Sequence, residues 1–543
     1  MMIQLAEKTL AGLCLEASAR YGKRTAFRYA KTEKHRDHRV SYGMMGLYSR
    51  QIGLLLRQLG VAPGGRVLIL AENSPEWPLA YFGIALAGAV SVPLLTGFSS
   101  DQVRYIIDHA KAAALFLSRA LSAKIDQVPE NIPVIYIDDI TSEISVSLGG
   151  QEKKIPLPSI ETNTERLPRS RQDDLASIIY TSGTFGNSKG VMLSGLNLIS
   201  SALSSLSMVK IFPRDRLLSV LPLAHAYECG MGLIAPVLCG AGVAYLDRPP
   251  SPSVLLPAAR ALRPTVMVTV PVFIEKMYNS AIAPALRKSR LYHSPLTRPL
   301  AIRFAGRKII SSLGGKIRFF GIGGAQLSAE VEHFLRRARF PFSIGYGLTE
   351  AAPLVAGNAP HRFPFRSSGS APAGLEMRIA ADGTGTKNDV GEIQIRGPNV
   401  MMGYYLDEAK TREAFTRDGW LKTGDLGCID KKRKLFIKGR IKALILGPGG
   451  ENIYPEEIEG LLGSSHLVEE ALVYSGEKGE LVAMVRLDEA AKAAAIAVEH
   501  AAEELRTWAN KKLASFSRLS RIEIRHEPFE KTPTMKIKRY LYA

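Results

Sequence analysis

Cysteine is scarce in this chain, and no two cysteines have the spacing of a metal site or a redox pair. The four cysteines, among 543 residues, are Cys14, Cys229, Cys239 and Cys428. This scarcity excludes a disulfide scaffold and a cysteine-rich zinc site, and a reduced compartment is the simplest expectation. We expect each cysteine to be a packing residue.

Long apolar runs are also missing. The most apolar stretches, residues 81–95 and 230–246, are interrupted by glycine and proline. They predict buried helices or strands and not membrane spans. The first residues lack the basic and apolar regions of a signal peptide. These absences favour a cytoplasmic protein.

Acidic residues are absent from residues 276 to 329. The basic residues of that stretch are Lys276, Arg287, Lys288, Arg290, Arg298, Arg303, Arg307, Lys308, Lys316 and Arg318. The whole chain has a net charge of +19, which attracts anions such as nucleotides, coenzyme phosphates or anionic lipids. Residues 276–318 allow two interpretations: a solvated basic face, or a docking surface for a membrane or an acidic carrier protein. Few aromatics and no binding motif argue against nucleic acid.

A loop rich in glycine and hydroxyl side chains is the most informative segment that is present. Residues 180–191 read Tyr-Thr-Ser-Gly-Thr-Phe-Gly-Asn-Ser-Lys-Gly-Val, after an apolar run at 175–179. Glycines let backbone N–H groups approach a phosphate, and lysine supplies a mobile positive charge. This composition predicts a polyphosphate site, although a small-residue surface loop without a ligand is the alternative.

The residues after this loop decide which class of phosphate site is expected. No helix starts directly after Lys189, as a P-loop NTPase requires, and the next candidate N-cap is Ser194. The pattern therefore predicts strand–loop–strand with the helix afterwards. The His-Arg-Asp and Asp-Phe-Gly signatures are missing, which disfavours a protein kinase.

The rest of the chain alternates helix-like and strand-like patterns. Helices are expected at 41–59 and 77–86, and strands at 66–70, 89–93, 216–221 and 265–270. This rhythm predicts an α/β fold with a large layered N-terminal domain of mixed sheets and helices. Residues 141–172 are polar and predict an irregular surface excursion.

The pattern changes near residue 440. The later part predicts a small α+β domain, with helices starting near 455 and over 492–514 and strands at 481–487 and 521–525. We therefore expect a large domain over residues 1–439 and a small C-terminal domain over residues 440–543.

Seven motifs occur in order along nearly the whole chain. They are the phosphate loop, Leu-Pro-Leu-Ala-His at 221–225, Gly-Gly-Ala-Gln at 323–326, Gly-Tyr-Gly-Leu-Thr-Glu at 345–350, Thr-Gly-Asp at 423–425 with Lys-Gly-Arg at 438–440, Gly-Gly-Glu-Asn-Ile-Tyr-Pro at 449–455, and Lys-Thr-Pro-Thr-Met-Lys-Ile at 531–537. With these motifs the chain resembles the adenylate-forming, AMP-binding acyl-CoA synthetases. It is most similar to bacterial long-chain fatty acid–CoA ligases. The resemblance implies that residues 1–439 are an adenylation domain and that residues 440–543 are a mobile C-terminal domain.

The resemblance implies a site for ATP and Mg²⁺. The ATP-binding residues it implies are Thr181, Ser182, Gly183, Thr184, Gly186, Lys189, Gly324, Ala325, Gln326, Tyr346, Gly347, Thr349, Asp425, Arg440 and Lys536. Thr184 and Glu350 would hold Mg²⁺, which prefers oxygen ligands and bridges phosphates. Read alone, Asp425 would be a turn residue and Glu350 a helix-capping carboxylate.

The resemblance also assigns the catalytic and acyl-binding residues. The catalytic set is Lys536, His225, Thr184 and Glu350, with Lys536 contacting the substrate carboxylate and the α-phosphate. Lys442 would be the hinge of the mobile domain, and CoA would meet Gly449, Gly450 and Glu451. The expected acyl pocket is His225, Gly230, Gly321, Gly323 and Gly345. A solvated tail lysine and a core histidine are the alternatives for Lys536 and His225.

The chain departs from the family pattern at Phe185, Ser188, Met535 and Ala443, and none of these changes removes a charged group that the chemistry needs. The implied function is ATP-dependent activation of a fatty acid and its transfer to CoA. Two alternatives are open: transfer to acyl carrier protein, and a nucleotide-binding protein with little turnover.

Overall fold

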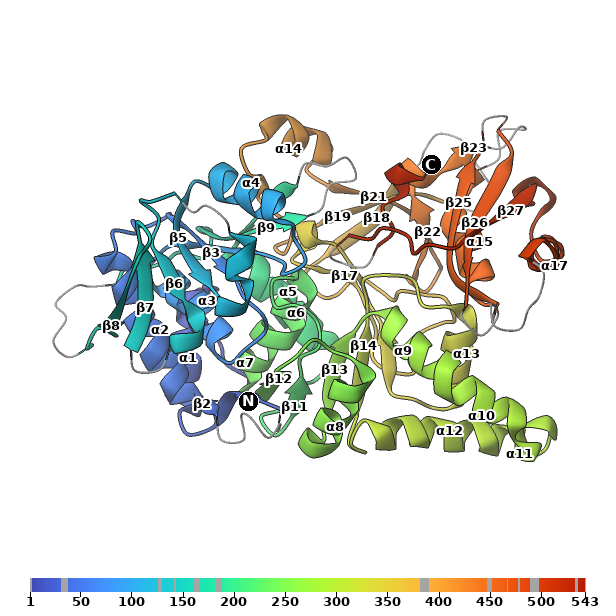
Figure 1. The fold of residues 1–543 in the computed structure, drawn as a ribbon, viewed down its shortest axis with the longest axis horizontal. Helices are drawn as coiled ribbons and strands as arrows, with labels where there is room; N and C mark the ends of the chain where they lie inside the picture. Colours follow the sequence, from blue (N-terminus) through green and yellow to red (C-terminus); the bar gives the residue numbers. More distant parts are fainter. Residues whose placement is uncertain are drawn as a thin grey trace.

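The computed structural model describes residues 2–30, 38–125, 129–140, 143–160, 167–181, 188–380, 390–446, 452–465, 467–476, 479–488, 498–532 and 536–542. Figure 1 shows a large layered body, coloured blue to yellow, and a smaller orange-red unit at one end. The expected mixed α/β fold with a large N-terminal and a smaller C-terminal domain is confirmed.

The first large sheet has nine strands within the described residues, in the order β20-β10-β9-β4-β3-β5-β6-β7-β8. Its strands are β3 (Arg66–Leu70), β4 (Val90–Pro93), β5 (Ala112–Leu117), β6 (Val134–Tyr136), β7 (Glu143–Leu148), β8 (Gln151–Pro156), β9 (Leu175–Thr181), β10 (Lys189–Ser194) and β20 (Gly403–Tyr404). The central strands β9, β4, β3, β5 and β6 run parallel. Their near-continuous apolar runs suit a sheet that is covered on both faces.

The second large sheet has seven strands in the described part of the chain, in the order β15-β14-β13-β11-β12-β1-β2. Its strands are β1 (Thr25–Tyr29), β2 (Arg39–Ser41), β11 (Arg216–Leu218), β12 (Gly242–Tyr245), β13 (Val266–Thr269), β14 (Phe319–Ile322) and β15 (Phe342–Ile344). Every neighbouring pair except β1–β2 is parallel. The carboxyl ends of β11, β13, β14 and β15 therefore meet at one edge.

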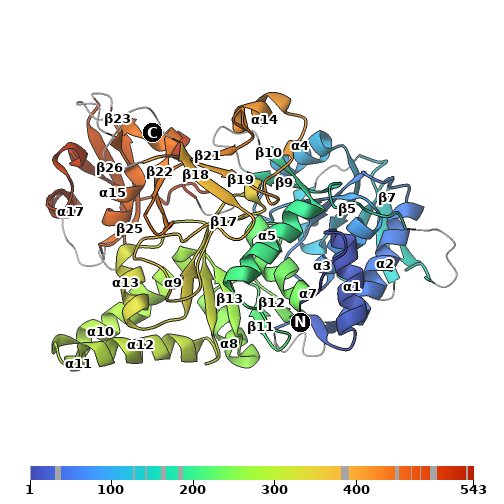
Figure 2. The ribbon, with the colours of Figure 1, turned by 180° about the vertical axis from the view of Figure 1, so that it is seen from behind.

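The alternation of side chains along the strands builds the layers. Val67 and Ile69 of β3 join one buried cluster, whereas Leu68 and Leu70 join another on the opposite face. The first cluster also contains Val243 of β12, so it fills the space between the two sheets. The helices of this middle layer are α1 (Leu10–Tyr21), α2 (Tyr42–Gln58), α3 (Glu76–Leu86), α5 (Gly195–Met208) and α7 (Ala235–Cys239), seen best from behind (Figure 2).

Helices also cover the outer faces of both sheets. On the nine-stranded sheet lies α4 (Ser100–Ala110). On the seven-stranded sheet lie α8 (Pro252–Leu262), α9 (Pro271–Met277), α10 (Ala283–Lys288), α12 (Arg298–Ser312) and α13 (Ala329–Arg337), with the short α11 (Arg290–His293) between α10 and α12.

A four-stranded antiparallel sheet, counted within the described residues, leads to the C-terminal unit. Its strands are β18 (Glu376–Ala380), β19 (Gly391–Arg396), β21 (Leu421–Ile429) and β22 (Leu435–Arg440), with β16 (Tyr346–Gly347), β17 (Leu354–Ala356) and α14 (Glu408–Ala414) nearby.

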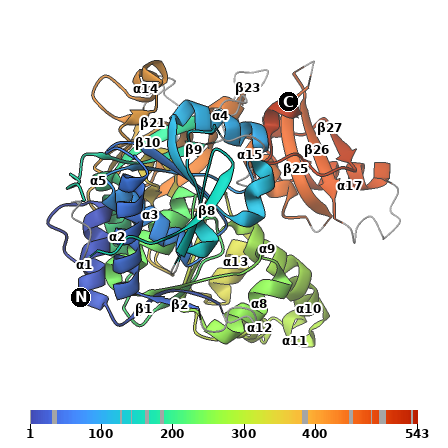
Figure 3. The same cartoon turned by 60° about the vertical axis from the view of Figure 1, so that its left-hand side comes forward.

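The C-terminal unit has a buried cluster of its own (Figure 3). Its elements are β23 (Ile445–Leu446), β24 (Asn452–Ile453), α15 (Pro455–Leu462), β25 (Val468–Ser475), β26 (Leu481–Leu487), α17 (Val498–Asn510) and β27 (Arg521–Arg525). The boundary at residue 439 and the mobility of this unit stay predictions.

One expectation about the fold is wrong. Residues 143–156 are not irregular, because β7 and β8 form a hairpin at the edge of the nine-stranded sheet. Ile144 and Val146 of β7 point into the core, but β8 is exposed along most of its length. A half-buried hairpin with a polar outer strand lacks the apolar run that marks a central strand. Within the described ranges, no helix has the length and apolar character needed to cross a membrane.

Candidate functional site

Three of the predicted site segments follow parallel strands of the seven-stranded sheet. The His225 segment follows β11, the segment Gly324-Ala325-Gln326 follows β14, and the segment from Tyr346 to Glu350 follows β15. Since the carboxyl ends of these strands meet at one edge, the fold brings these segments together. Gly324, Ala325 and Gln326 are exposed at this edge, and Gly324 has a φ of +86°, which favours glycine.

The phosphate loop lies between paired strands, as predicted. Strands β9 and β10 are antiparallel, with Thr181 opposite Lys189. Helix α5 begins only after Ser194, whose side chain accepts from the N–H of Asn197. The strand–loop–strand expectation is thereby confirmed. The loop residues Ser182, Gly183, Thr184, Phe185 and Gly186 lie outside the described residues.

Lys189, Tyr404 and Glu350 form a connected group beside this loop. The Nζ atom of Lys189 lies 4.9 Å from the centre of the Tyr404 ring, a cation–π distance. The Tyr404 hydroxyl donates to Oε1 of Glu350 at 3.0 Å. A lysine charge and a half-buried carboxylate thus stand close together, as a phosphate with a bound cation would need.

Asp425 is the buried centre of a second group. It is 5% exposed. The hydroxyl of Tyr346 donates to its Oδ2 at 2.6 Å, and Nε of Arg440 lies 3.0 Å from its Oδ1. Burial and this carboxylate raise the pKa of Tyr346, and Asp425 raises the pKa of Arg440. Asp425 and Arg440 face each other because they are register partners on β21 and β22.

Lys536 reaches this group from the end of the chain. A short turn holds it. In this turn the N–H of Thr532 donates to the Lys536 carbonyl at 2.7 Å, and the backbones of Lys531 and Ile537 form an isolated antiparallel β-bridge. Its side chain is exposed to solvent, although surrounding protein lowers the pKa of its ammonium group, and Arg440 lowers it further. Asp425 and Glu350 act on it in the opposite direction. Lys536 therefore lies within electrostatic reach of Asp425, Glu350 and Arg440.

His225 lies within electrostatic reach of the same lysine. Burial, with the charge of Lys536 as a smaller cause, lowers the pKa of its imidazole to about 4. Its Nδ1 accepts from the N–H of Tyr227 at 3.2 Å. A neutral ring that accepts at Nδ1 carries its proton on Nε2, so Nε2 can donate to an incoming oxygen.

Two of the predicted acyl-pocket glycines, Gly321 and Gly323, lie beside Tyr227. A Cβ atom on Gly321 would lie 2.8 Å from the Tyr227 hydroxyl, and one on Gly323 would lie 3.2 Å from the Tyr227 ring. A Cβ on Gly230 would meet Pro353 at 3.3 Å, whereas one on Gly345 would meet only the Ala356 carbonyl at 3.8 Å. The space that Gly321 and Gly323 leave is therefore occupied by Tyr227 in this structure.

Some of the remaining predicted residues are described by the structure and others are not. Lys442 is exposed in a single turn, Ile441–Ala443, directly after β22. Gly449, Gly450, Glu451 and Met535 lie outside the described residues. Gly347 is exposed and Thr349 is half-buried.

Two neighbours of the site were not predicted from the sequence. Tyr404 reaches Glu350 because β20 pairs with β10, more than two hundred residues earlier in the chain. Oε2 of Glu456 accepts from the backbone N–H of Arg440 at 3.0 Å. The carboxylate of Glu456 was visible in the first turn of α15, but nothing in the sequence linked it to Arg440.

Comparison with known proteins agrees with these motifs. The model of the family described as "AMP-binding enzyme" matches residues 14–405. The chain belongs to the AMP-binding enzyme family. The long-chain-fatty-acid–CoA ligase FadD15 of Mycobacterium bovis is 30% identical to it, over 91% of this chain and 88% of that protein. The 4-coumarate–CoA ligase of Vanilla planifolia is 28% identical to it, over 98% of this chain and 92% of that protein.

Solved structures share the fold of this AMP-binding enzyme. ATP-bound MatB from Rhodopseudomonas palustris superposes with a TM-score of 0.76, at 24% identity, covering 98% of each chain. At this identity the likeness shows the fold alone.

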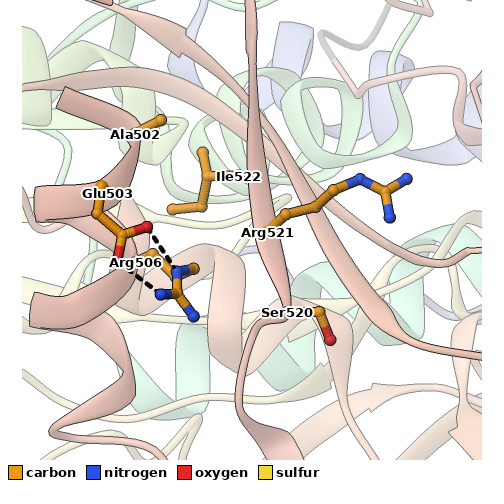
Figure 4. Close-up of a pocket in the computed structure, with 6 residues that line it drawn as sticks. All are labelled: Ala502, Glu503, Arg506, Ser520, Arg521 and Ile522. Atoms are coloured by element: carbon orange, nitrogen blue, oxygen red, sulfur yellow. Dashed lines mark hydrogen bonds and ion pairs between the residues drawn. The ribbon is translucent and has the colours of Figure 1, made fainter. Parts of the chain in front are cut away.

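A pocket lies in the C-terminal unit, between α17 and β27 (Figure 4). It has a volume of about 360 Å³ and is lined by Ala502, Glu503, Arg506, Ser520, Arg521 and Ile522. Its charged side chains pair with one another or with neighbours: Arg506 with Glu503, and Arg521 with Glu480 and Glu523. It contains none of the predicted site residues.

Glu228 is a fully buried carboxyl group three residues after His225. It has no exposed surface, and neither oxygen has a partner in hydrogen-bond geometry among the described residues. Burial raises the pKa of Glu228 to about 8, although the Ser219 hydroxyl and the Leu221 N–H, which lie nearby without meeting the geometry of a hydrogen bond, oppose this shift. The folded protein therefore favours the neutral acid.

This burial predicts a pH-dependent stability. Between pH 4.5 and about 8 the unfolded chain ionises Glu228 while the folded protein keeps it protonated, so stability falls as pH rises through this window. Glu228→Gln stays neutral. The free energy of unfolding of the variant minus that of the wild type should therefore increase as pH rises, by up to about 1.4 kcal/mol per pH unit across the window. Urea unfolding at a series of pH values measures this difference.

A matched control separates this titration from the substitution itself. Glu413→Gln changes an exposed carboxylate on α14. The difference in free energy of unfolding between this variant and the wild type should be the same at each pH. A Glu228→Gln difference that does not change with pH would contradict the buried, protonated state.

Proposed function

We propose that this AMP-binding enzyme activates a fatty acid in two steps. A carboxylate oxygen of the acid attacks the α-phosphorus of ATP, and the bond to the β-phosphate oxygen breaks, which releases pyrophosphate. The thiol of CoA then attacks the carbonyl carbon of the acyl-adenylate, and AMP leaves as the acyl-CoA forms. No protein nucleophile is needed, because the adenylate is already activated.

The observation that carries this proposal is the Asp425–Arg440 ion pair with Lys536 and Glu350 within electrostatic reach of it. In the first step negative charge gathers where the acid meets the α-phosphate, and fixed positive charge there lowers the barrier. Lysine offers a compact charge on a long stem. Lys536 would contact both groups, and Nε2 of neutral His225 would orient the acid.

The other residues would hold the nucleotide. Asp425 would accept from the ribose hydroxyls beside Arg440. The adenine would lie against Tyr346 and the segment Gly324-Ala325-Gln326, near Gly347 and Thr349. Thr181, Lys189 and the loop residues Ser182, Gly183, Thr184 and Gly186 would bind the β- and γ-phosphates.

The residues present also fit a magnesium ion. Glu350 offers a carboxylate next to Lys189 and Tyr404, and oxygen donors are what Mg²⁺ prefers. Thr184 would be its second protein ligand. When bound, the ion would neutralise phosphate charge during pyrophosphate release.

The second step needs a different arrangement of the small domain. We propose that it turns about Lys442, which withdraws Lys536 and brings Gly449, Gly450 and Glu451 towards the thiol of CoA. The electrostatic reach of Lys536 to Asp425 and Arg440 supports reading the arrangement described here as that of the first step. The contacts to be broken are polar: Glu456 accepts from the Arg440 N–H, and Lys438 pairs with Glu457 at 3.0 Å.

We propose a long-chain fatty acid as the substrate. The FadD15 relative, at 30% identity over most of both chains, supports this choice, while the 4-coumarate ligase relative makes an aromatic acid the comparison to include. The acyl pocket would be formed around His225, Gly230, Gly321, Gly323 and Gly345. An acyl chain would enter the space near Gly321 and Gly323 only if the Tyr227 side chain moved.

A pyrophosphate-release assay with ATP, Mg²⁺ and a panel of acids tests the function. We expect release with long-chain fatty acids to exceed release with short acids and 4-coumarate, and the thioester to form with CoA. Preference for 4-coumarate would overturn the substrate class. Transfer to acyl carrier protein but not to CoA would overturn the acceptor, and no release with any carboxylate would overturn the enzyme.

A further inference from the structure

The outer edge of the large domain carries exposed apolar side chains. Leu296 is 90% exposed, Phe304 71%, Leu300 63% and Leu291 58%. They lie on α11, on α12 and in the turn between these helices, where α10–α12 extend along the edge of the molecule (Figures 1 and 2). Single exposed apolar residues need no explanation, but a contiguous group marks an interaction surface.

The spacing places two of these side chains in one row on α12. Leu300 and Phe304 are four residues apart, so they share a face of the helix, and Leu296 lies in the turn directly before it. The opposite face of α12 is buried through Ala301, Ile302, Ala305 and Ile309. The helix thus has a second apolar row that faces away from its own core.

Positive charge borders this row. Arg303 and Arg307 lie one turn apart beside the apolar row. Lys308 lies one turn after Phe304, at the end of the row. All three are exposed, and none has an ion pair with another described residue. The segment 276–329 has no acidic residue that would neutralise them.

This combination fits one kind of partner. An apolar row with arginine and lysine at its border is the pattern of a helix that lies in the plane of a membrane, with its apolar side chains among the lipid head groups. Unpaired Lys and Arg strengthen such binding when the lipids are anionic.

We propose that Leu291, Leu296, Leu300 and Phe304, with Arg303 and Arg307, form a docking surface for anionic membranes. The docking proposal goes beyond the proposed function and does not depend on it.

Vesicle co-sedimentation of the full chain, without ATP or fatty acid, tests the surface. Wild-type protein should bind vesicles of phosphatidylglycerol mixed with phosphatidylcholine and bind much less to phosphatidylcholine alone. The triple variant Leu296→Ser, Leu300→Ser, Phe304→Ser should lose about tenfold or more in affinity, because its apolar row is gone. Arg303→Gln with Arg307→Gln should also lose about tenfold on the mixed vesicles.

A matched variant lies at the opposite end of the molecule. Leu148→Ser with Lys153→Gln and Lys154→Gln removes an exposed leucine and two exposed cations from the β7–β8 hairpin, and should bind like the wild type. Circular dichroism and thermal melting check that all variants fold.

Three outcomes would overturn the docking surface: no vesicle binding by the wild type, equal loss in the hairpin variant, or unchanged binding by both α12 variants. If the chain ignores vesicles but the α12 variants lose binding to an acidic carrier protein, the face docks a protein and the membrane proposal is wrong. Failure here would leave the ATP-dependent assay unaffected, so the two proposals fail separately.

Discussion

Lys536→Ala is expected to slow acyl-adenylate formation by about 10²–10³-fold, whereas thioester formation from supplied acyl-adenylate and CoA should be largely retained. The reason is that the charge of Lys536 is needed where the acid meets the α-phosphate and is not needed once that bond exists. Pyrophosphate release measures the first step, and thioester formation from synthetic acyl-adenylate measures the second.

The control for this substitution lies two residues away. Lys538 pairs with Glu530 at 3.1 Å on the same short segment, so Lys538→Ala removes a lysine and an ion pair without removing the proposed catalytic charge. It should leave both steps nearly unchanged. Equal loss of both steps in Lys536→Ala would contradict the role in adenylation.

Asp425→Asn is expected to raise the KM for ATP by about 10–100-fold. The substitution keeps the size of the side chain but removes a buried charge that holds both Tyr346 and Arg440. Hydrogen bonds from the ribose hydroxyls to a carboxylate are stronger than those to a neutral amide. Initial rates at varied ATP and calorimetric titration with ATP measure the loss.

Two variants separate nucleotide binding from loss of structure. Asp418 also pairs with an arginine, at 2.7 Å from Arg378, but it is exposed and belongs to no predicted site, so Asp418→Asn should not change the KM for ATP. Tyr346→Phe keeps the ring and removes one hydrogen bond to Asp425, and should have a smaller effect than Asp425→Asn. A normal KM in a folded Asp425→Asn variant would remove Asp425 from the ribose site.

The sequence predicted the buried parts of the fold well. Residues 66–70, 481–487 and 521–525 form β3, β26 and β27 with the expected bounds. The helix expected at 41–59 is α2, capped by the Ser41 side chain. Apolar runs and helix caps are local signals, so a single sequence reveals them. The β7–β8 hairpin was missed because its outer strand is stabilised by pairing and not by apolar burial.

The candidate site was predictable only as a list of separate segments. Glycine, lysine and carboxylate residues indicated phosphate chemistry, but their meeting depends on how the parallel strands are ordered. Tyr404 and Glu456 join the site through contacts between distant segments. For residues 276–318 the sequence shows the charge, but only the structure shows that Leu296, Leu300 and Phe304 are left uncovered.

The separate buried cluster of the C-terminal unit affects how the stability of this protein should be measured. Ile453, Ile458, Leu462 and their neighbours pack among themselves and not into the large core. We therefore expect two units that lose their structure in separate steps, for which one two-state unfolding energy is not a sufficient description. A denaturation curve should be separated into two transitions. The titration of Glu228 would shift only the transition of the large domain.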